Sequence, residues 1–191
     1  MHIAFITSEY PHSKVNTTYA GIGTANKNLI DGLIDQGQKV SLFLYSQDST
    51  FNIDEGNLKV YSIKKRKFKF FSFFLHSIYL NKYINNIINK ENVDIVEAAD
   101  WTGITAFMKF RVPLVVRLHG SDTFFCNLEK RKQKFKNYIF EKLALINSDA
   151  IIGVSSFVLK KTLDLFNLNK PSVVIPNGLF IDTFKNKKNT K

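Results

Sequence analysis

Cysteine is scarce in this chain and long hydrophobic runs are missing, and both absences limit what the protein can be. Of its 191 residues one is cysteine, Cys126, which excludes an internal disulfide and a cysteine-rich zinc site. The longest apolar-rich segment, near Phe70–Leu80, is about half of the ~20 residues that a transmembrane helix needs. The first residues also lack the basic start, apolar stretch and cleavage site of a signal peptide. We therefore expect a cytoplasmic protein, either free or peripheral on the inner face of the plasma membrane.

Acidic residues are few beside basic ones: 16 Asp and Glu stand against 27 Lys and Arg, giving a formal net charge of +11. A positive surface attracts phosphate in nucleic acids, nucleotides or anionic lipids, and charge alone does not choose among them. The segment Lys64–Leu75 combines basic with aromatic residues, which suits contact with an anionic membrane surface. A solvated loop that leads into a core helix is the alternative. Because no recognition motif accompanies these residues, we expect no nucleic-acid partner.

Short apolar runs alternate with longer amphipathic segments. The runs are mostly continuous, as in strands that helices bury on both faces. The segment Thr24–Gln36 carries apolar residues at intervals of three and four, and Gly37 supplies its end. This order predicts an α/β fold, with a doubly wound, mainly parallel sheet of about seven strands and helices on both faces. The expected strands are Ile3–Thr7, Val40–Tyr45, Leu58–Ile63, Ile95–Ala98, Leu114–Leu118, Ala150–Val154 and Ser172–Ile175, and the expected helices are Thr24–Gln36, Phe73–Asn89, Thr102–Lys109, Glu129–Asn147 and Ser156–Phe166.

A long polar loop separates the first strand from the glycines that open the first helix. Ligands of open α/β sheets sit at the carboxyl ends of the strands, where glycines let the backbone come close and helix amides attract anions. Gly21 and Gly23 are therefore candidates to bind a diphosphate, and a tight turn is the alternative. The dinucleotide fingerprint is incomplete, because Asn26 stands at the third glycine position, and no G-K-[ST] follows. The second strand also ends in Tyr45-Ser46-Gln47 without the acid that a dehydrogenase needs, so we disfavour that enzyme class.

Six short motifs follow one another along nearly the whole chain. They are Ile3–Tyr10 with Ala20–Thr24, Leu33–Val40, Asp94–Trp101, Val115–Asp122, Glu141–Ser155, and Val174–Gly178 with Asp182 and Phe184. In this order and spacing they resemble the N-terminal, Rossmann-like domain of retaining glycosyltransferases of family 4, which have the GT-B fold. Ala20 replaces a frequent glycine of that family. Glu97 and Ala99 stand where the family often has histidines.

The resemblance implies an activity and a domain plan. The activity would be sugar transfer from a nucleotide-diphosphate sugar to a glycan or lipid-linked acceptor, with retention at the anomeric carbon, in cell-surface polysaccharide synthesis. No cofactor and no metal is implied. The domain would span residues 1–184, followed by a linker or tail at 185–191. The C-terminal domain that binds the donor diphosphate would be absent. This chain alone would therefore be inactive. A different Rossmann-type nucleotide enzyme and a non-catalytic membrane-docking module are the alternatives.

The resemblance also suggests roles for residues at strand ends. His119 would contact the transferred sugar, where imidazole can donate to a hydroxyl or stabilise charge in the transition state. A structural histidine at a strand end is the alternative. Asp100 would bind substrate. Asp122 would also bind substrate, unless it caps a turn or helix. Trp101 would stack on an acceptor sugar, and core packing is its alternative.

Two further pairs of residues are predicted to have structural roles. Ser155 and Ser156 suit the N-cap of a helix. Asn177 and Gly178 suit a turn into an interdomain linker.

Overall fold

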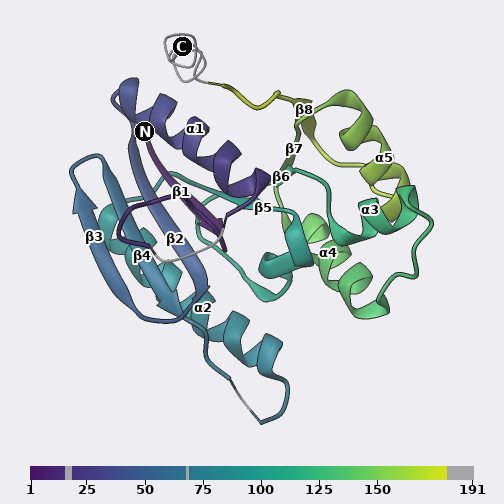
Figure 1. The fold of residues 1–191 in the computed structure, drawn as a ribbon, viewed down its shortest axis with the longest axis horizontal. Helices are drawn as coiled ribbons and strands as arrows, with labels where there is room; N and C mark the ends of the chain where they lie inside the picture. Colours follow the sequence, from purple (N-terminus) through teal and green to yellow (C-terminus); the bar gives the residue numbers. More distant parts are fainter. Residues whose placement is uncertain (16–18, 68, 180–191) are drawn as a thin grey trace, which may run out of the picture.

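A computed structural model of the protein describes residues 1–15, 19–67 and 69–179. In this part of the chain the strands form one eight-stranded sheet in the order β3-β4-β2-β1-β5-β6-β7-β8 (Figure 1). All neighbours are parallel except β3, which pairs antiparallel with β4. The strands are β1 His2–Thr7, β2 Lys39–Gln47, β3 Phe51–Glu55, β4 Leu58–Lys64, β5 Ile95–Ala99, β6 Leu114–Leu118, β7 Ala150–Gly153 and β8 Ser172–Val174, and the helices are α1 Gly21–Asp35, α2 Ser72–Glu91, the 3₁₀ helix η1 Trp101–Phe107, α3 Asp122–Leu128, α4 Phe135–Asn147 and α5 Ser156–Phe166.

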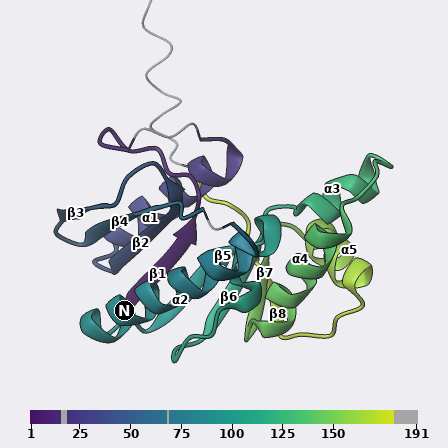
Figure 2. The same ribbon diagram turned by 90° about the horizontal axis from the view of Figure 1, so that it is seen from below.

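Successive residues of a strand enter apolar layers on opposite faces of the sheet. In β1, Ile3 belongs to the layer that contains Ile30 of α1. The next residue, Ala4, belongs to the layer that contains Leu80 of α2. Figure 2 shows α1 and α2 on opposite sides of the sheet, and a third apolar cluster joins α4 and α5 to β6 and β7. Burial on both faces explains the continuous apolar runs and confirms the predicted α/β fold.

Strand β3 is an element that the sequence pattern does not predict. Its residues Asp54 and Glu55 are exposed, and among Phe51–Glu55 Ile53 is the only buried residue. The strand forms a hairpin with β4 through a turn at Gly56, whose φ of +75° suits glycine. An edge strand with one buried residue carries too little apolar pattern to be recognised.

The predicted helices between residues 102 and 147 need correction. The helix expected over Thr102–Lys109 is the 3₁₀ helix η1, because Thr102 and Gly103 take left-handed φ values of 56° and 63°. The helix expected over Glu129–Asn147 begins only at Phe135, after Lys130 with a φ of 52°. Helix α3 is absent from the predicted elements.

Two further predictions concern membrane crossing and the C-terminal end of the chain. None of the helices within the described ranges combines the length and apolar character that a membrane crossing requires. The motif residues Asp182 and Phe184 and the predicted tail 185–191 lie outside the described residues.

Candidate functional site

A cavity of about 400 Å³ opens at the carboxyl ends of the central parallel strands. It brings together Gly21, Trp101 and His119, three of the six predicted site residues, while Gly23, Asp100 and Asp122 are not among its lining residues. The cavity therefore lies at the sheet edge where α/β proteins place their ligands. Its described lining consists of Glu9, Ala20, Gly21, Ile22, Trp101, His119, Gly120, Phe125, Val154 and Asn177.

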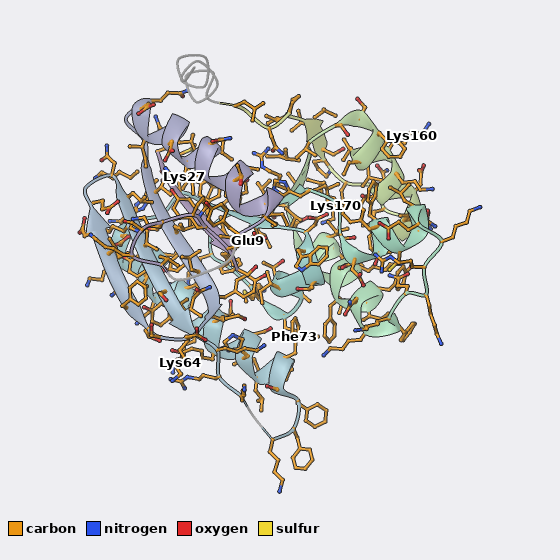
Figure 3. All side chains as sticks on the ribbon, in the orientation of Figure 1. Glu9, Lys27, Lys64, Phe73, Lys160 and Lys170 are labelled. Atoms are coloured by element: carbon orange, nitrogen blue, oxygen red, sulfur yellow. The ribbon has the colours of Figure 1, made fainter. Side chains whose placement is uncertain are left out.

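One side of the cavity, the glycine wall, consists of Glu9 and residues 20–22. Helix α1 begins there without a side-chain cap, and the Ala20 N–H donates to a carboxylate oxygen of Glu9, which lies beside the start of α1 (Figure 3). The first-turn N–H groups of a helix have no intrahelical acceptor and attract negative charge. Gly21 and Ile22, which carry two of these first-turn amides, line the cavity.

Gly23 supports this wall from behind. A Cβ at Gly23 would lie 2.9 Å from Tyr19 Cβ and 3.3 Å from Glu9 Cγ. The missing side chain thus lets Tyr19 and Glu9 pack directly against α1. The structure places Gly23 beside the cavity lining and not in it.

Another side of the cavity is formed by the segment 119–125, here called the histidine wall, of which His119, Gly120 and Phe125 line the cavity. The backbone N–H groups of His119 and Gly120 donate to the two carboxylate oxygens of Asp100, each at 3.1 Å. Asp100 is buried, and burial raises its pKa to about 7 against the opposing effect of these two N–H donors. Gly120 has a φ of +106°, and a Cβ there would lie 2.8 Å from the ring of Phe125. Asp100 therefore acts on the cavity through the loop that it holds.

A second buried carboxylate holds the other end of the histidine wall. Glu141 of α4 accepts from the backbone N–H groups of Asp122 and Thr123, each at 3.1 Å, and from the Thr123 hydroxyl. Burial raises the pKa of Glu141. The α3 N-cap is Ser121, whose hydroxyl accepts from the N–H of Phe124. The Asp122 carboxylate accepts from Asn137 Nδ2 at 2.8 Å, so it is tied to α4.

The imidazole of His119 is neutral near pH 7. Burial, and secondarily the charge of Arg117, lower its pKa to about 4. Its Nε2 atom is buried and has no hydrogen-bond partner within the described ranges. A buried nitrogen without a partner costs free energy unless a ligand satisfies it. His119 lines the cavity, and its Nε2 atom is shielded from solvent there.

The buried guanidinium of Arg117 is occupied by other groups. Its Nε and Nη2 atoms donate to the two carboxylate oxygens of Glu97, at 2.6 and 3.2 Å. Its Nη1 atom donates to the carbonyl of Ile175, just after β8, at 3.3 Å. Glu97, the acceptor in this bidentate pair, stands at one of the two positions where the resembling family often has histidines.

Several lining residues were not among the predicted site residues. Glu9 follows β1 by two positions, so its place at a strand end could have identified it. Phe125 lies in α3, a helix that the sequence pattern does not predict, and no local pattern marks Val154. Asn177, predicted only for a turn, also lines the cavity, whereas Ser155 caps α5 as predicted, its hydroxyl accepting from the Val158 N–H. Within the described ranges, no three His, Cys, Asp or Glu side chains converge on a point that could hold a metal ion.

Comparison with known proteins gives consistent matches. The family model described as Glycosyltransferase Family 4 matches residues 19–182. An uncharacterised glycosyltransferase of Methanocaldococcus jannaschii is 27% identical over 156 residues, which cover 78% of this chain and 42% of that protein. The chain thus spans less than half the length of this relative.

Solved structures with low sequence identity share the fold. A sucrose-phosphate synthase structure from Thermosynechococcus elongatus aligns with a TM-score of 0.63 at 13% identity, over 96% of this chain and 93% of that chain. A UDP-forming α,α-trehalose-phosphate synthase from Burkholderia xenovorans, in complex with glucose-6-phosphate, aligns with a TM-score of 0.62 at 10% identity, over 95% of this chain and 51% of that chain. The architecture is the Rossmann-like half of a GT-B fold.

Proposed function

The chain belongs to glycosyltransferase family 4, and from this premise we propose that it forms the acceptor-side half of an enzyme that transfers a sugar from a nucleotide-diphosphate donor. The acceptor is a glycan or a lipid-linked glycan, and transfer proceeds with retention at the anomeric carbon. The observation that carries the proposal is the single cavity where the start of α1, Trp101 and His119 meet.

The two walls have separate tasks in this proposal. The first-turn amides of α1 stabilise negative charge on the leaving diphosphate, as helix N-termini do for phosphates. His119, neutral because its pKa is held near 4, serves as a hydrogen-bond partner of the transferred sugar. Asp100 and Glu141 act indirectly, by fixing the backbone that carries His119.

A second domain that completes the cleft is part of the proposal. The described lining of the cavity contains no Lys or Arg to neutralise a diphosphate. In family 4 the resemblance assigns such residues to the C-terminal domain, and this chain spans 42% of its archaeal relative. Residues 1–184 are then the first domain, and 185–191 begin the connection to the next.

The test compares this chain with the complete gene product. Both are incubated with a panel of radiolabelled nucleotide sugars and with lipid and glycan extracts as acceptors. We expect transfer by the complete protein and none by this chain. Robust transfer by the chain alone would overturn the half-enzyme proposal.

We also propose that this domain rests on an anionic membrane surface through Lys64–Leu75, as an enzyme of cell-surface polysaccharide synthesis would. Phe70 and Phe71 are 68% and 82% exposed and follow Lys69 directly. Phe73 instead packs on Phe140, with ring centroids 4.6 Å apart. A core helix behind a solvated loop explains Phe73 but not the two exposed rings, which suit the headgroup region beside basic residues. Position 68 of this segment lies outside the described residues.

Vesicle sedimentation tests the membrane proposal. We expect binding to vesicles with phosphatidylglycerol and weak binding to pure phosphatidylcholine. Replacing Phe70 and Phe71 by serine should reduce binding several-fold, whereas Phe157→Ser, at a residue of α5 that is 60% exposed, should not. Equal losses in both variants would contradict a contact at this segment.

A further inference from the structure

Two stretches of the chain carry basic residues and no acidic ones. Residues 56–90 contain eight Lys and Arg, residues 130–140 contain five, and neither stretch contains Asp or Glu. The first stretch includes Lys64–Leu75, for which we propose a membrane contact. Within the described ranges, Lys59 and Arg131 are the members of the two stretches that form ion pairs with carboxylates. The other Lys and Arg residues have no carboxylate partner in the described part of the chain.

The second stretch exposes an aromatic ring. Its residues 130–136, here called the α4 entry segment, lead from α3 into the first turn of α4. Phe135 in this segment is 77% exposed and stands between Lys134 and Lys136, which are exposed as well. Single exposed rings are ordinary on a protein surface, but an exposed ring among cations without carboxylate partners repeats the character of Lys64–Leu75.

Aromatic contacts place the two segments side by side. Phe73, labelled in Figure 3, stacks on Phe140 of α4, and Phe107 of η1 packs edge-on against both rings. The Nζ atom of Lys136 lies 5.3 Å from the ring centroid of Phe73 and 5.4 Å from that of Phe140. The start of α2 and the start of α4 are therefore neighbours, so the α4 entry segment adjoins Lys64–Leu75.

The helix η1 joins these rings to the cavity. Phe107, the last residue of η1, packs edge-on against Phe74 of α2 with ring centroids 5.1 Å apart, and Phe74 is 42% exposed. Trp101, the first residue of η1, lines the cavity. One short helix thus separates the surface that the two segments form from the cavity.

We infer that an anionic lipid bilayer contacts this domain at two places, Lys64–Leu75 and the α4 entry segment, and that Phe135 is an aromatic anchor of the second contact. The inference rests on the membrane contact in the proposed function and adds a second contact to it. Lysines attract negative lipid headgroups, and exposed aromatic rings enter the headgroup region, which a soluble polyanion does not offer. Two contacts restrict the tilt of the domain, and through η1 they set how the cavity is turned relative to the bilayer.

Vesicle sedimentation with a matched pair of variants tests the second contact. Phe135 and Phe157 both stand in the first turn of a helix, and both are more than half exposed. With vesicles that contain phosphatidylglycerol, we expect Phe135→Ser to weaken binding several-fold and Phe157→Ser to leave it unchanged. Urea denaturation checks that both variants remain as stable as the wild type. Equal binding by both variants would overturn the second contact.

Two double variants separate local charge from net charge. Lys132→Gln with Lys134→Gln removes two charges from the α4 entry segment, whereas Lys39→Gln with Lys160→Gln removes two charges from β2 and α5. Each lysine near an anionic bilayer strengthens binding by about fivefold, so the first pair should lose about tenfold or more. The second pair should lose much less. Equal losses would show that the vesicles respond to net charge alone and would overturn the second contact.

A tryptophan at position 135 reports the contact directly. The chain has a single tryptophan, so Phe135→Trp in a Trp101→Phe background leaves one emitter, in the α4 entry segment. We expect its emission to shift to shorter wavelength on anionic vesicles and to be quenched by brominated phosphatidylcholine within them. Heparin, a soluble polyanion, should cause no such shift. The same shift with heparin, or none with vesicles, would overturn the inference.

Failure of this inference is distinguishable from failure of the proposed function. If Phe135→Ser binds vesicles as the wild type does while the variant with serine at Phe70 and Phe71 loses binding, the second contact fails and the first stands. If the wild type binds no vesicles, both contacts fail. The proposed sugar transfer depends on the cavity and stands in either case.

Discussion

The two walls of the cavity are supported to different degrees. On the histidine wall, four backbone N–H groups between His119 and Thr123 donate to two buried carboxylates, those of Asp100 and Glu141. On the glycine wall, one backbone N–H, that of Ala20, donates to the carboxylate of Glu9. The chain thus fixes the wall that faces the transferred sugar in the proposed function, and it holds the start of α1 by a single such bond among the described residues.

The two buried carboxylates that hold the histidine wall lower the stability of the native state. Burial raises the pKa of both Asp100 and Glu141, so each carboxylate destabilises the native state when it is ionised. The N–H donors offset part of that cost. Groups with perturbed pKa values gather at functional sites more often than elsewhere. The histidine wall therefore has the character of a preorganised site.

The largest effect should come from the side chain that the histidine wall presents. We expect His119→Ala in the complete enzyme to lower turnover by about 10²–10³-fold, as for loss of one hydrogen bond made in the transition state. Its loss of stability should be small, because Nε2 has no partner in the described part of the protein. Steady-state kinetics and urea denaturation measure the two effects.

A matched histidine provides the control for this variant. His76 of α2 is also buried, and its ring nitrogens have no hydrogen-bond partner in the described residues, but it lies outside the cavity lining. His76→Ala should leave turnover per folded molecule unchanged. Equal losses of turnover in both variants would remove the distinction between the site and the core.

The second largest effect should come from the support of the histidine wall. Gly103 of η1 has a φ of +63°, and a Cβ there would lie 2.3 Å from the backbone of Phe140, next to Glu141. We expect Gly103→Ala to lower the free energy of unfolding by about 3 kcal/mol or more, because neither backbone can yield cheaply. Gly32→Ala in α1, where a Cβ meets nothing within 4 Å in the described part of the chain, should change the free energy of unfolding by less than about 1 kcal/mol. Similar denaturation curves for both variants would contradict the tight packing of η1 on α4.

The elements that support the histidine wall are also the part of the fold that the sequence does not predict. Strands such as β1 and β6 are predicted within about a residue, because burial on both faces leaves a continuous apolar run. Helix α3 is not predicted, since its first turn is held by Glu141, which lies 19 residues from Asp122 along the chain. The 3₁₀ form of η1 likewise depends on the contact between Gly103 and Phe140. Long-range contacts of this kind leave no local periodicity.

The sequence likewise predicts only part of the site. Strand ends identify the correct edge of the sheet, and so Gly21, Trp101 and His119 lie on one cavity. The strand-end position does not tell whether a side chain points into the cavity or back into the protein. Asp100 points back, to the N–H groups of the His119 loop, and only the three-dimensional arrangement reveals it.

The third prediction separates the titration of His119, in the histidine wall, from that of Asp100, which holds this wall through its backbone. Asp100 has a folded pKa of about 7, above its ordinary 3.8, so its contribution to stability is lost as pH rises from about 3.8 to 7. His119 has a folded pKa of about 4, below its ordinary 6.5, so its contribution is lost as pH falls from about 6.5 to 4. The two slopes oppose each other between pH 4 and 6.5.

Single variants should therefore tilt the pH profile in opposite directions. Relative to the wild type, stability of Asp100→Asn should rise with pH across this window, and that of His119→Gln should fall, each by up to about 1.4 kcal/mol per pH unit. Urea denaturation at pH 4.5, 5.5 and 6.5 measures these differences. Parallel profiles for all three proteins would show that neither group is perturbed in the native state.

The smallest effect on stability should occur on the glycine wall. A Cβ at Gly21 meets no atom of the described residues within 4 Å, so Gly21→Ala should change the free energy of unfolding by less than about 0.5 kcal/mol. The added methyl group nevertheless stands on the cavity wall, where the proposed diphosphate approaches the first-turn amides. We expect the KM for the sugar nucleotide in the complete enzyme to rise several-fold while the KM for the acceptor stays constant. Gly23→Ala is the contrasting variant. Its Cβ would lie 2.9 Å from Tyr19 Cβ, so it should also lower the free energy of unfolding. An unchanged donor KM in Gly21→Ala would mean that the first-turn amides bind no diphosphate, and the contrast between the walls would then concern folding alone.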